Sequence, residues 1–241
     1  MNREVILLNN DSVIYLQMGN PSEAFKLLTE ASNIVTKLFQ RQCTSTNFAH
    51  RPYRYTWVNF SDSMSGCFRD LNRRDENGSL PFLYLSALKI ATSCTHEDFD
   101  DFDDDDTEDS LCACYDSDDY CPCGIAWVVW YNLAIACSIL GLGRGENGHQ
   151  YLEKAYRLYE VVRGRISEQS PSIDWSTLLM AVFNNQSCIY YEYAMYDESI
   201  ECLDKVKDVL RKMPRDGANA DWQVFSLNLM LLRKPKLAAA A

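Results

Sequence analysis

The segment 127–159, WVVWYNLAIACSILGLGRGENGHQYLEKAYRLY, shows helical periodicity on both sides of a glycine-rich turn. In its first half, apolar and small side chains recur at helical offsets of 0, 3, 4, 7, 10, 11 and 14: Trp127, Trp130, Tyr131, Ala134, Cys137, Ser138 and Gly141. Its second half is two-faced, with Leu152, Ala155 and Tyr159 opposite charged residues. Ala134 and Ala155 allow close backbone approach, and Gly141 is expected to end the first helix in a left-handed conformation. This pattern predicts a helical hairpin.

The residues WYNLA, Gly141 and the Lys154-Ala155 step resemble the tetratricopeptide repeat, a helix-turn-helix unit of about 34 residues. Two further segments keep that spacing, the second more loosely: Asn10, Tyr15, Gly19, Ala24, Leu28 and Ala31, then Asn185, Tyr190, Tyr196, Ile200 and Leu203. The middle copy has a longer turn, with Gly148 where the family usually has alanine, and the third copy has Ala194 where the family prefers glycine. The resemblance covers about half of the chain and implies an α-α superhelix.

We therefore predict one mainly α-helical, tetratricopeptide-like domain over residues 1–241. Its expected parts are a first helical hairpin at 2–40, an inserted β-hairpin region at 41–96, an acidic disordered loop with a cysteine cluster at 97–123, second and third helical hairpins at 124–213, and a capping helix at 219–233. The strand signals of the insertion are the alternating Tyr53, Tyr55 and Trp57, and the run Pro81–Ile90, whose Leu and Ala content also allows a helix. The tail from Lys236 to Ala241 is left out of the fold reasoning.

The net charge of -11 is concentrated in one segment, because residues 97–119 hold 13 of the 34 acidic side chains and no Lys or Arg. The rest of the chain has 21 acidic against 23 basic side chains and shows no clustered basic face. A nucleic-acid partner is therefore not expected. The acidic run repels itself and has little apolar surface to bury, which predicts a disordered loop.

A cytoplasmic protein with reduced thiols is the expected context. The apolar run near the N-terminus is too short for a secretory signal or a membrane span. Several of the ten cysteines fall on predicted core faces, where they behave as small hydrophobic residues. Cys112, Cys114, Cys121 and Cys123 are sufficient in number for a zinc site, but their C-x-C spacing differs from the usual C-x2-C. Whether they bind a metal stays open, and we expect no cofactor.

Residues 120–143 contain no charged side chain, so a membrane helix has to be weighed. Pro122 and Gly124 are expected to interrupt it, which leaves 16 residues from Ile125 to Leu140, fewer than the roughly 20 that a span needs. A fully buried helix explains the same composition, and no membrane partner is expected. The G-x-G-x-x-G run at 143–148 follows a predicted helix rather than a strand, and the three histidines form no catalytic motif.

The strongest functional signal is a set of paired polar residues on the predicted first helices: Asn9-Asn10, Tyr131-Asn132 and Asn184-Asn185. The resemblance implies that these helices line a concave groove. An amide both donates and accepts, so Asn10, Tyr131, Asn132 and Asn185 are predicted to bind the main chain of an extended peptide. An equally weighted interpretation is that these asparagines bond to neighbouring helices and hold the stack together.

These observations predict a non-catalytic module that binds a protein or peptide partner of unknown identity. The family's members that clamp a carboxylate place Lys or Arg along the groove, and the matching positions here have none. The alternative is an enzyme or small-ligand-binding protein, with a pocket between the helical stack and the inserted hairpin that uses Tyr53, Tyr55 and Trp57. A deep, closed pocket with convergent titratable groups would favour this alternative.

Overall fold

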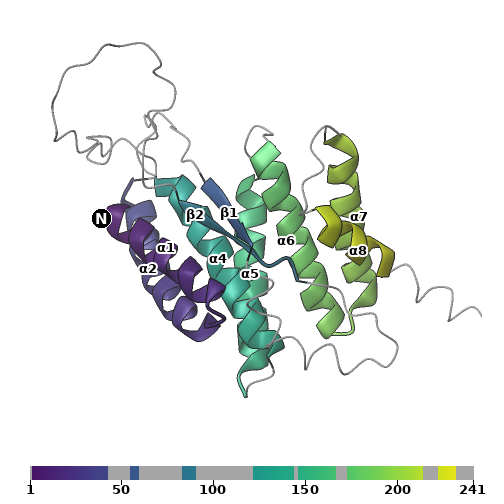
Figure 1. The fold of residues 1–241 in the computed structure, drawn as a ribbon, viewed down its shortest axis with the longest axis horizontal. Coiled ribbons are helices and arrows are strands. Elements are labelled where there is room, and N and C mark those ends of the chain that lie inside the picture. Colours follow the sequence, from purple (N-terminus) through teal and green to yellow (C-terminus); the bar gives the residue numbers. More distant parts are fainter. Residues whose placement is uncertain are drawn as a thin grey trace, which may run out of the picture.

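The computed structural model of the chain describes residues 2–42, 55–59, 83–90, 122–143, 146–166, 173–213 and 222–231. These residues form seven helices and two strands (Figure 1): α1 (Asn2–Gln17), α2 (Pro21–Gln42), β1 (Tyr55–Asn59), β2 (Ser86–Ile90), α4 (Pro122–Leu142), α5 (Gly148–Ile166), α6 (Ile173–Glu192), α7 (Tyr196–Lys212) and α8 (Trp222–Leu231). The prediction of a mainly helical chain is confirmed, and α8 lies within the range 219–233 where a helix is predicted.

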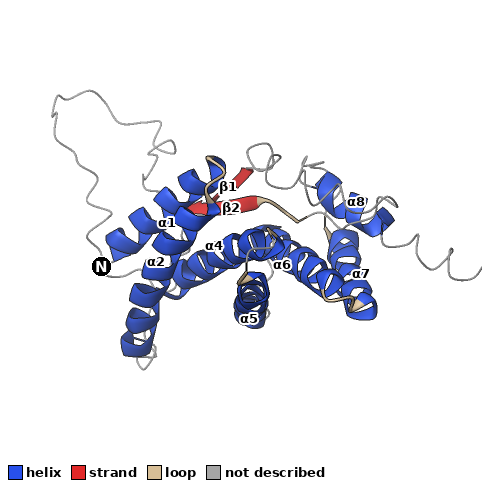
Figure 2. Ribbon diagram, turned by 90° about the horizontal axis from the view of Figure 1, so that it is seen from below, coloured by secondary structure: helices blue, strands red, loops and turns tan. Residues whose placement is uncertain are grey.

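The helices pack as three consecutive pairs, α1 with α2, α4 with α5, and α6 with α7, and α8 packs against α6 and α7. The pairs also contact one another through α2 and α4 and through α5 and α6. Figure 2 shows that they follow an arc, with the two strands and α8 on its concave side. We call the surface of α1, α4 and α6 that faces the strands the concave face. One apolar core joins all the pairs, and its largest fully buried aromatic side chains are Tyr84, Tyr131, Tyr159 and Phe225.

The turns of the first and third pairs have the same backbone hydrogen bonds. The N–H of Gly19 bonds to Leu16 at 3.0 Å, and the N–H of Asn20 bonds to Tyr15 at 2.9 Å. At the end of α6, Ala194 and Met195 bond to Tyr191 and Tyr190 at the same two distances. Gly19 and Ala194 both have positive φ angles, 71° and 58°. This is the Schellman arrangement, which ends a helix by placing one residue in the left-handed region.

The prediction that Gly141 ends its helix in a left-handed conformation is wrong. Gly141 lies inside α4, and Gly19 is the glycine with positive φ among the described residues. What Gly141 provides is space, because a Cβ there would lie 2.6 Å from Cγ of Leu152 and 3.0 Å from the carbonyl oxygen of Gly148. A Cβ on Gly148 would in turn lie 2.9 Å from the Gly141 carbonyl oxygen. The two glycines therefore allow α4 and α5 to cross closely, with Ala134 and Ala155 buried further along the pair.

The expectation that Pro122 and Gly124 interrupt the apolar run is also wrong, because α4 begins at Pro122 and continues through Gly124. Proline lacks the N–H that the first helical position leaves unpaired, and its fixed φ suits that position. Residues 125–142 consequently form a window of 18 residues with a mean hydropathy of 1.9, long and apolar enough to span a membrane. Of this window, 83% is buried inside the structure, and the core helix of a soluble protein passes the same test.

The predicted pair of strands is confirmed as a two-stranded antiparallel sheet in which Tyr55 lies opposite Ile90 and Asn59 opposite Ser86. The run ending at Ile90 is thus a strand, not a helix. The acidic loop at 97–119 lies outside the described residues, as do Cys112, Cys114 and Cys121. The side chain of Cys123 is also outside the description, so the predicted disorder and the metal question stay predictions.

Candidate functional site

Three asparagines on the concave face hold the main chain of an extended segment, residues 83–90, which we call the β2 segment. The three, Asn10 on α1, Asn132 on α4 and Asn185 on α6, form what we call the asparagine row. Asn10 accepts from the N–H of Ile90 and donates to its carbonyl, both at 2.9 Å. Asn132 does the same with Leu88 at 2.9 and 2.8 Å, and Asn185 with Tyr84 at 2.7 and 3.3 Å. Each carboxamide therefore binds both polar groups of one residue.

This geometry imitates a neighbouring β-strand. In an antiparallel ladder, two opposite residues exchange both N–H···O=C bonds at every second position. The row meets Tyr84, Leu88 and Ile90, and the hydroxyl of Tyr131 donates to the carbonyl of Ser86 at 3.0 Å, so consecutive alternate positions on one edge are bound. Since successive backbone groups of a strand point to opposite edges, those of Ala87 and Lys89 face β1. The β2 segment thus lies between a true strand and a row of carboxamides.

The spacing of the row fits the spacing of packed helices. Ile90 and Tyr84 are six residues apart, which is about 20 Å of extended chain at ~3.4 Å per residue. Two steps from α1 through α4 to α6 cover the same total span if neighbouring axes are on average about 10 Å apart, the upper end of ordinary helix packing. The two steps are unequal, with two residues from Ile90 to Leu88 and four from Leu88 to Tyr84. One extended segment can therefore meet one asparagine from each first helix.

The asparagines also bond to one another, and the pattern occurs twice. Asn9 donates to Asn10 at 3.3 Å, and Asn132 on the next helix donates to Asn9 at 2.9 Å. In the same way, Asn184 donates to Asn185 at 3.3 Å, and Asn228 on α8 donates to Asn184 at 2.7 Å. The interpretation that asparagines bond to neighbouring helices thus has a counterpart in the structure. The extended segment that the row binds belongs to the same chain, and binding of a partner stays a prediction.

Asn228 was not predicted from the sequence. The available signal was an asparagine within the apolar α8 run, and the structure shows that this side chain is fully buried. Tyr159 was also missed as a polar contributor. Its hydroxyl accepts from Asn185 at 3.1 Å and lies 3.3 Å from the hydroxyl of Ser138, which itself donates to the carbonyl of Ala134. Because the proton of Ser138 is committed to that carbonyl, Tyr159 is the donor to Ser138. This chain of bonds connects α6, α5 and α4.

The groups behind the asparagine row are neutral. Burial raises the pKa of the Tyr159 hydroxyl, and its hydrogen bonds with Ser138 and Asn185 only partly offset this. Burial likewise raises the pKa of Cys137 to about 12, with a small opposing effect from Lys154, and it raises the pKa of Cys188. The asparagine row itself consists of neutral amides, which suit an uncharged ligand such as a peptide main chain.

Aromatic side chains surround the first bound residue of the β2 segment. The ring of Tyr84 stacks on Phe225 of α8, with centroids 4.8 Å apart, and meets Trp57 of β1 edge-on at 5.8 Å. Trp57 also meets Tyr131 edge-on at 5.9 Å. Trp57, one of the aromatic residues proposed for an alternative pocket, therefore packs against Tyr84 of the β2 segment and Tyr131 of α4. Tyr53 lies outside the described residues, as does the side chain of Tyr55.

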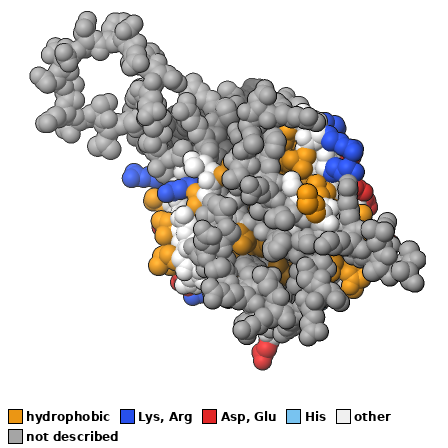
Figure 3. All heavy atoms as spheres, turned by 45° about the vertical axis from the view of Figure 1, so that its right-hand side comes forward, with side chains coloured by type: hydrophobic (Ala, Val, Ile, Leu, Met, Phe, Trp, Pro, Cys, Tyr) orange, Lys and Arg blue, Asp and Glu red, His pale blue; other side chains and the backbone are white. Residues whose placement is uncertain are grey.

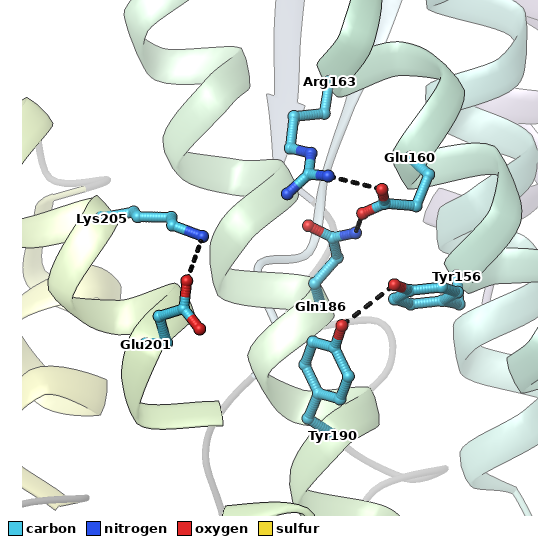
Figure 4. A network of polar contacts seen from close by, with 7 residues as sticks. All are labelled: Tyr156, Glu160, Arg163, Gln186, Tyr190, Glu201 and Lys205. Atoms are coloured by element: carbon cyan, nitrogen blue, oxygen red, sulfur yellow. Dashed lines mark hydrogen bonds and ion pairs between the residues drawn. The ribbon is translucent and has the colours of Figure 1, made fainter. Parts of the chain in front are cut away.

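A second polar cluster lies between α5, α6 and α7 (Figure 4). Glu160 accepts from Gln186 at 2.6 Å and from Arg163 at 2.5 Å, while Lys205 pairs with Glu201 at 2.8 Å. The hydroxyls of Tyr156 and Tyr190 are 3.0 Å apart. The carboxylates in this cluster are thus paired with cations from their own helices. This arrangement cross-links α5 and α6 rather than presenting a free acid or base.

Figure 3 shows the side of the molecule around α7 and α8, where described apolar side chains lie among Lys, Arg and some acidic groups. The charges visible on this face are of both signs. Within the described residues, no group of three or more His, Cys, Asp or Glu side chains is placed to hold a metal ion.

All four residues predicted to bind a peptide, Asn10, Tyr131, Asn132 and Asn185, contact the main chain of the β2 segment of the same chain. Comparisons of the chain with models of known protein families, with curated proteins and with solved structures found no match.

Proposed function

We propose that this protein is a non-catalytic interaction module of tetratricopeptide-like architecture, whose concave face binds an extended protein segment through its main chain. The observation that carries the proposal is that Asn10, Asn132 and Asn185 each bind the N–H and the C=O of a single residue. Such bonds recognise extended chain without requiring a particular side chain. The chain's own β2 segment is an example of an extended main chain bound in this way, and this supports the proposal.

Two observations support the tetratricopeptide-like part of the proposal. The turns at Gly19 and Ala194 have matching hydrogen bonds, as expected if the first and third pairs are copies of one unit. The row also takes one asparagine from the first helix of every pair, and the Asn-to-Asn bonds of α1 and α4 recur between α6 and α8. A stack of equivalent units would place one such side chain on the first helix of each unit.

The buried Tyr159 hydroxyl and the buried thiols of the core are poorly suited to acid-base catalysis. A general acid or base near neutral pH needs a pKa close to the working pH. Burial moves the pKa of Tyr159, Cys137 and Cys188 upwards, away from neutrality, so these groups stay protonated.

A partner must compete with the β2 segment, which occupies the concave face and belongs to the same chain. A tethered segment acts at an effective concentration in the millimolar range, so a free peptide gains little occupancy unless the attached copy is weakened. The substitution Leu88→Gly removes a buried side chain of the β2 segment but keeps its N–H and C=O groups and the whole asparagine row. It therefore weakens the attached copy and leaves the proposed binding face unchanged.

The test uses the full chain with Leu88→Gly and a labelled peptide of the sequence LYLSALKI, residues 83–90. We expect the variant to bind this peptide more tightly than wild type in fluorescence anisotropy, and the peptide to raise its melting temperature. The matched control is N-methylation. A methyl on the nitrogen that corresponds to Leu88 removes the bond to Asn132 and is expected to abolish binding, whereas a methyl at Leu85 leaves the bonds to the row intact.

Equal binding of the two methylated peptides, or no binding by a folded Leu88→Gly chain, would contradict main-chain recognition. If Leu88→Gly does not fold, Ile90→Ala replaces it, because this change also removes a buried side chain without touching the row. If either variant refolds only when the unmodified peptide is present, that result also supports the proposal.

A further inference from the structure

We infer that the partner of the concave face is a protein segment with an aromatic residue, two small residues and two aliphatic residues in the order aromatic-x-small-small-aliphatic-x-aliphatic, which binds by replacing the β2 segment. This inference rests on the proposed function and adds to it the sequence class of the ligand. It follows from the surroundings of each side chain of the segment that occupies the face.

The first position selects an aromatic ring. Tyr84 is almost completely buried, stacked on Phe225 and edge-on to Trp57. A flat site between two aromatic residues is filled well by another ring, and such ring pairs favour binding beyond the area that they bury. An aliphatic side chain at this position would lose both ring contacts.

The next positions select by size. Ser86 and Ala87 have almost no exposed surface, so a larger side chain at either would have to displace packed neighbours. Leu88 and Ile90 are buried as well, at 3% and 1% exposure, in a strand that packs against α4 and α1. Lys89 is exposed, so this position accepts any residue. Five constrained positions and two unconstrained positions, those of Leu85 and Lys89, define the pattern.

The β2 segment determines when a partner segment can replace it. Eight hydrogen bonds from side chains of the helices hold the main chain of the β2 segment, and a partner's main chain makes the same eight. The difference between attached and incoming segments therefore lies in side-chain fit and in effective concentration, not in hydrogen bonding. A partner exchanges when its side chains fit better than those of residues 84–90, or when it binds at high local concentration.

The test is a positional scan of the LYLSALKI peptide against the full Leu88→Gly chain, read as dissociation constants. Replacing Tyr84 by Phe is expected to preserve affinity, while replacing it by Ser is expected to weaken binding by about tenfold or more, as is a change of Ala87 to Leu. Replacing Lys89 by Glu is the matched control and is expected to change affinity less than about twofold. In the protein, Phe225→Ala should remove most of the preference for Tyr over Ser.

The outcomes separate the two proposals. Losses of affinity that are large at the buried positions and small at the exposed position support the pattern. Similar affinities for all peptides with an unmodified main chain would overturn the pattern and leave the proposed function standing. No binding by any peptide to a folded variant would overturn both. A wild-type dimer in sedimentation analysis that free LYLSALKI dissociates would show that a second copy of the chain is the occupant, and would overturn the inference of a separate partner.

Discussion

Ala194 has a backbone conformation that residues other than glycine rarely adopt. Its φ of 58° lies in the left-handed region, where a Cβ approaches the following carbonyl oxygen. Gly19 performs the same role in the first pair without that contact. The turn after α6 is therefore held by its two backbone hydrogen bonds and by the packing of α6 on α7, against an unfavourable local conformation.

The substitution Ala194→Gly is expected to stabilise the protein by about 1 kcal/mol, because the removal of the Cβ relieves a left-handed strain of about 1 to 2 kcal/mol, against a small gain in unfolded-state entropy. The measurement is the free energy of unfolding in urea. Gly19→Ala is the matched control in the equivalent turn and should shift stability by a similar amount in the opposite direction. A loss of stability in Ala194→Gly would show that the methyl group packs usefully.

Cys137 predicts a specific loss of stability in alkali. Its pKa is raised from 9.0 to about 12 by burial. Between these values the unfolded chain releases the thiol proton while the folded chain retains it, so the folded state binds more protons and stability falls as pH rises. The contribution is fully present below pH 9 and is lost as pH rises towards about 12.

At pH 10.5 this one thiol lowers the free energy of unfolding by about 2 kcal/mol relative to pH 8, since each pH unit contributes about 1.4 kcal/mol. Urea unfolding under reducing conditions at the two pH values measures the difference. In Cys137→Ala the difference between pH 8 and pH 10.5 should shrink by that amount. If wild type and variant lose the same stability, ionisation of Cys137 does not contribute.

At the scale of elements, the crossing of α4 and α5 depends on the absence of a side chain at one place. The Cβ of an alanine at 148 would lie 2.9 Å from the backbone oxygen of Gly141, and backbone on both sides leaves little freedom to adjust. At Gly164, further along the same helix, a Cβ meets no atom within 4 Å. One substitution can therefore be compared at two positions of a single helix.

Gly148→Ala is expected to destabilise the protein by about 1 to 3 kcal/mol, because the two helices must separate to admit the methyl group. Gly164→Ala is expected to stabilise it by up to about 1 kcal/mol, through the higher helix propensity of alanine. Thermal or urea unfolding of both variants measures whether each substitution raises or lowers the stability. The same sign at both positions would mean that close contact between Gly141 and Gly148 does not hold the pair together.

Sequence reasoning located the elements because their signals are local. The recurrence of Ala24, Leu28 and Ala31 identifies the buried face of α2, and the alternation of Tyr53, Tyr55 and Trp57 with polar residues indicates the first strand. The run Pro81–Ile90 has no such alternation, so its sequence alone left a helix open. The role of Gly141 was misjudged because a glycine near a helix end has two uses, conformational freedom and space, and only the position of Leu152 distinguishes them. Pro122 was misjudged because proline interrupts a helix in its interior but suits its first position.

At the scale of the whole molecule, what the asparagines bind could not be predicted from spacing. The sequence indicates that Asn10, Asn132 and Asn185 suit an extended main chain, but it does not say which one. Asn10 and Ile90 are 80 residues apart, and periodicity contains no information on contacts across such a distance. The β2 segment crosses α1, α4 and α6, so one short strand joins the first pair to the third along the concave face.

This arrangement couples two distant positions. Asn10 and Asn185 hold opposite ends of the β2 segment, about 20 Å apart along the strand. Each alanine variant is expected to lose about 1 to 3 kcal/mol, because the buried N–H and C=O of Ile90 or Tyr84 lose their partner. Side chains this far apart normally have additive effects on stability. Here the first loss loosens the segment, so the second has less left to disrupt.

We therefore expect the double variant Asn10→Ala, Asn185→Ala to be more stable than the sum of the single losses predicts, by about 0.5 kcal/mol or more. A double-mutant cycle in urea measures this difference. Asn10→Ala combined with Ala194→Gly is the control. The turn bonds of Ala194 and Met195 go to Tyr191 and Tyr190, not to the β2 segment, so the two stability changes should add. Additive losses for the two asparagines would mean that the ends of the segment open independently, and that the strand does not transmit a change between the first and third pairs.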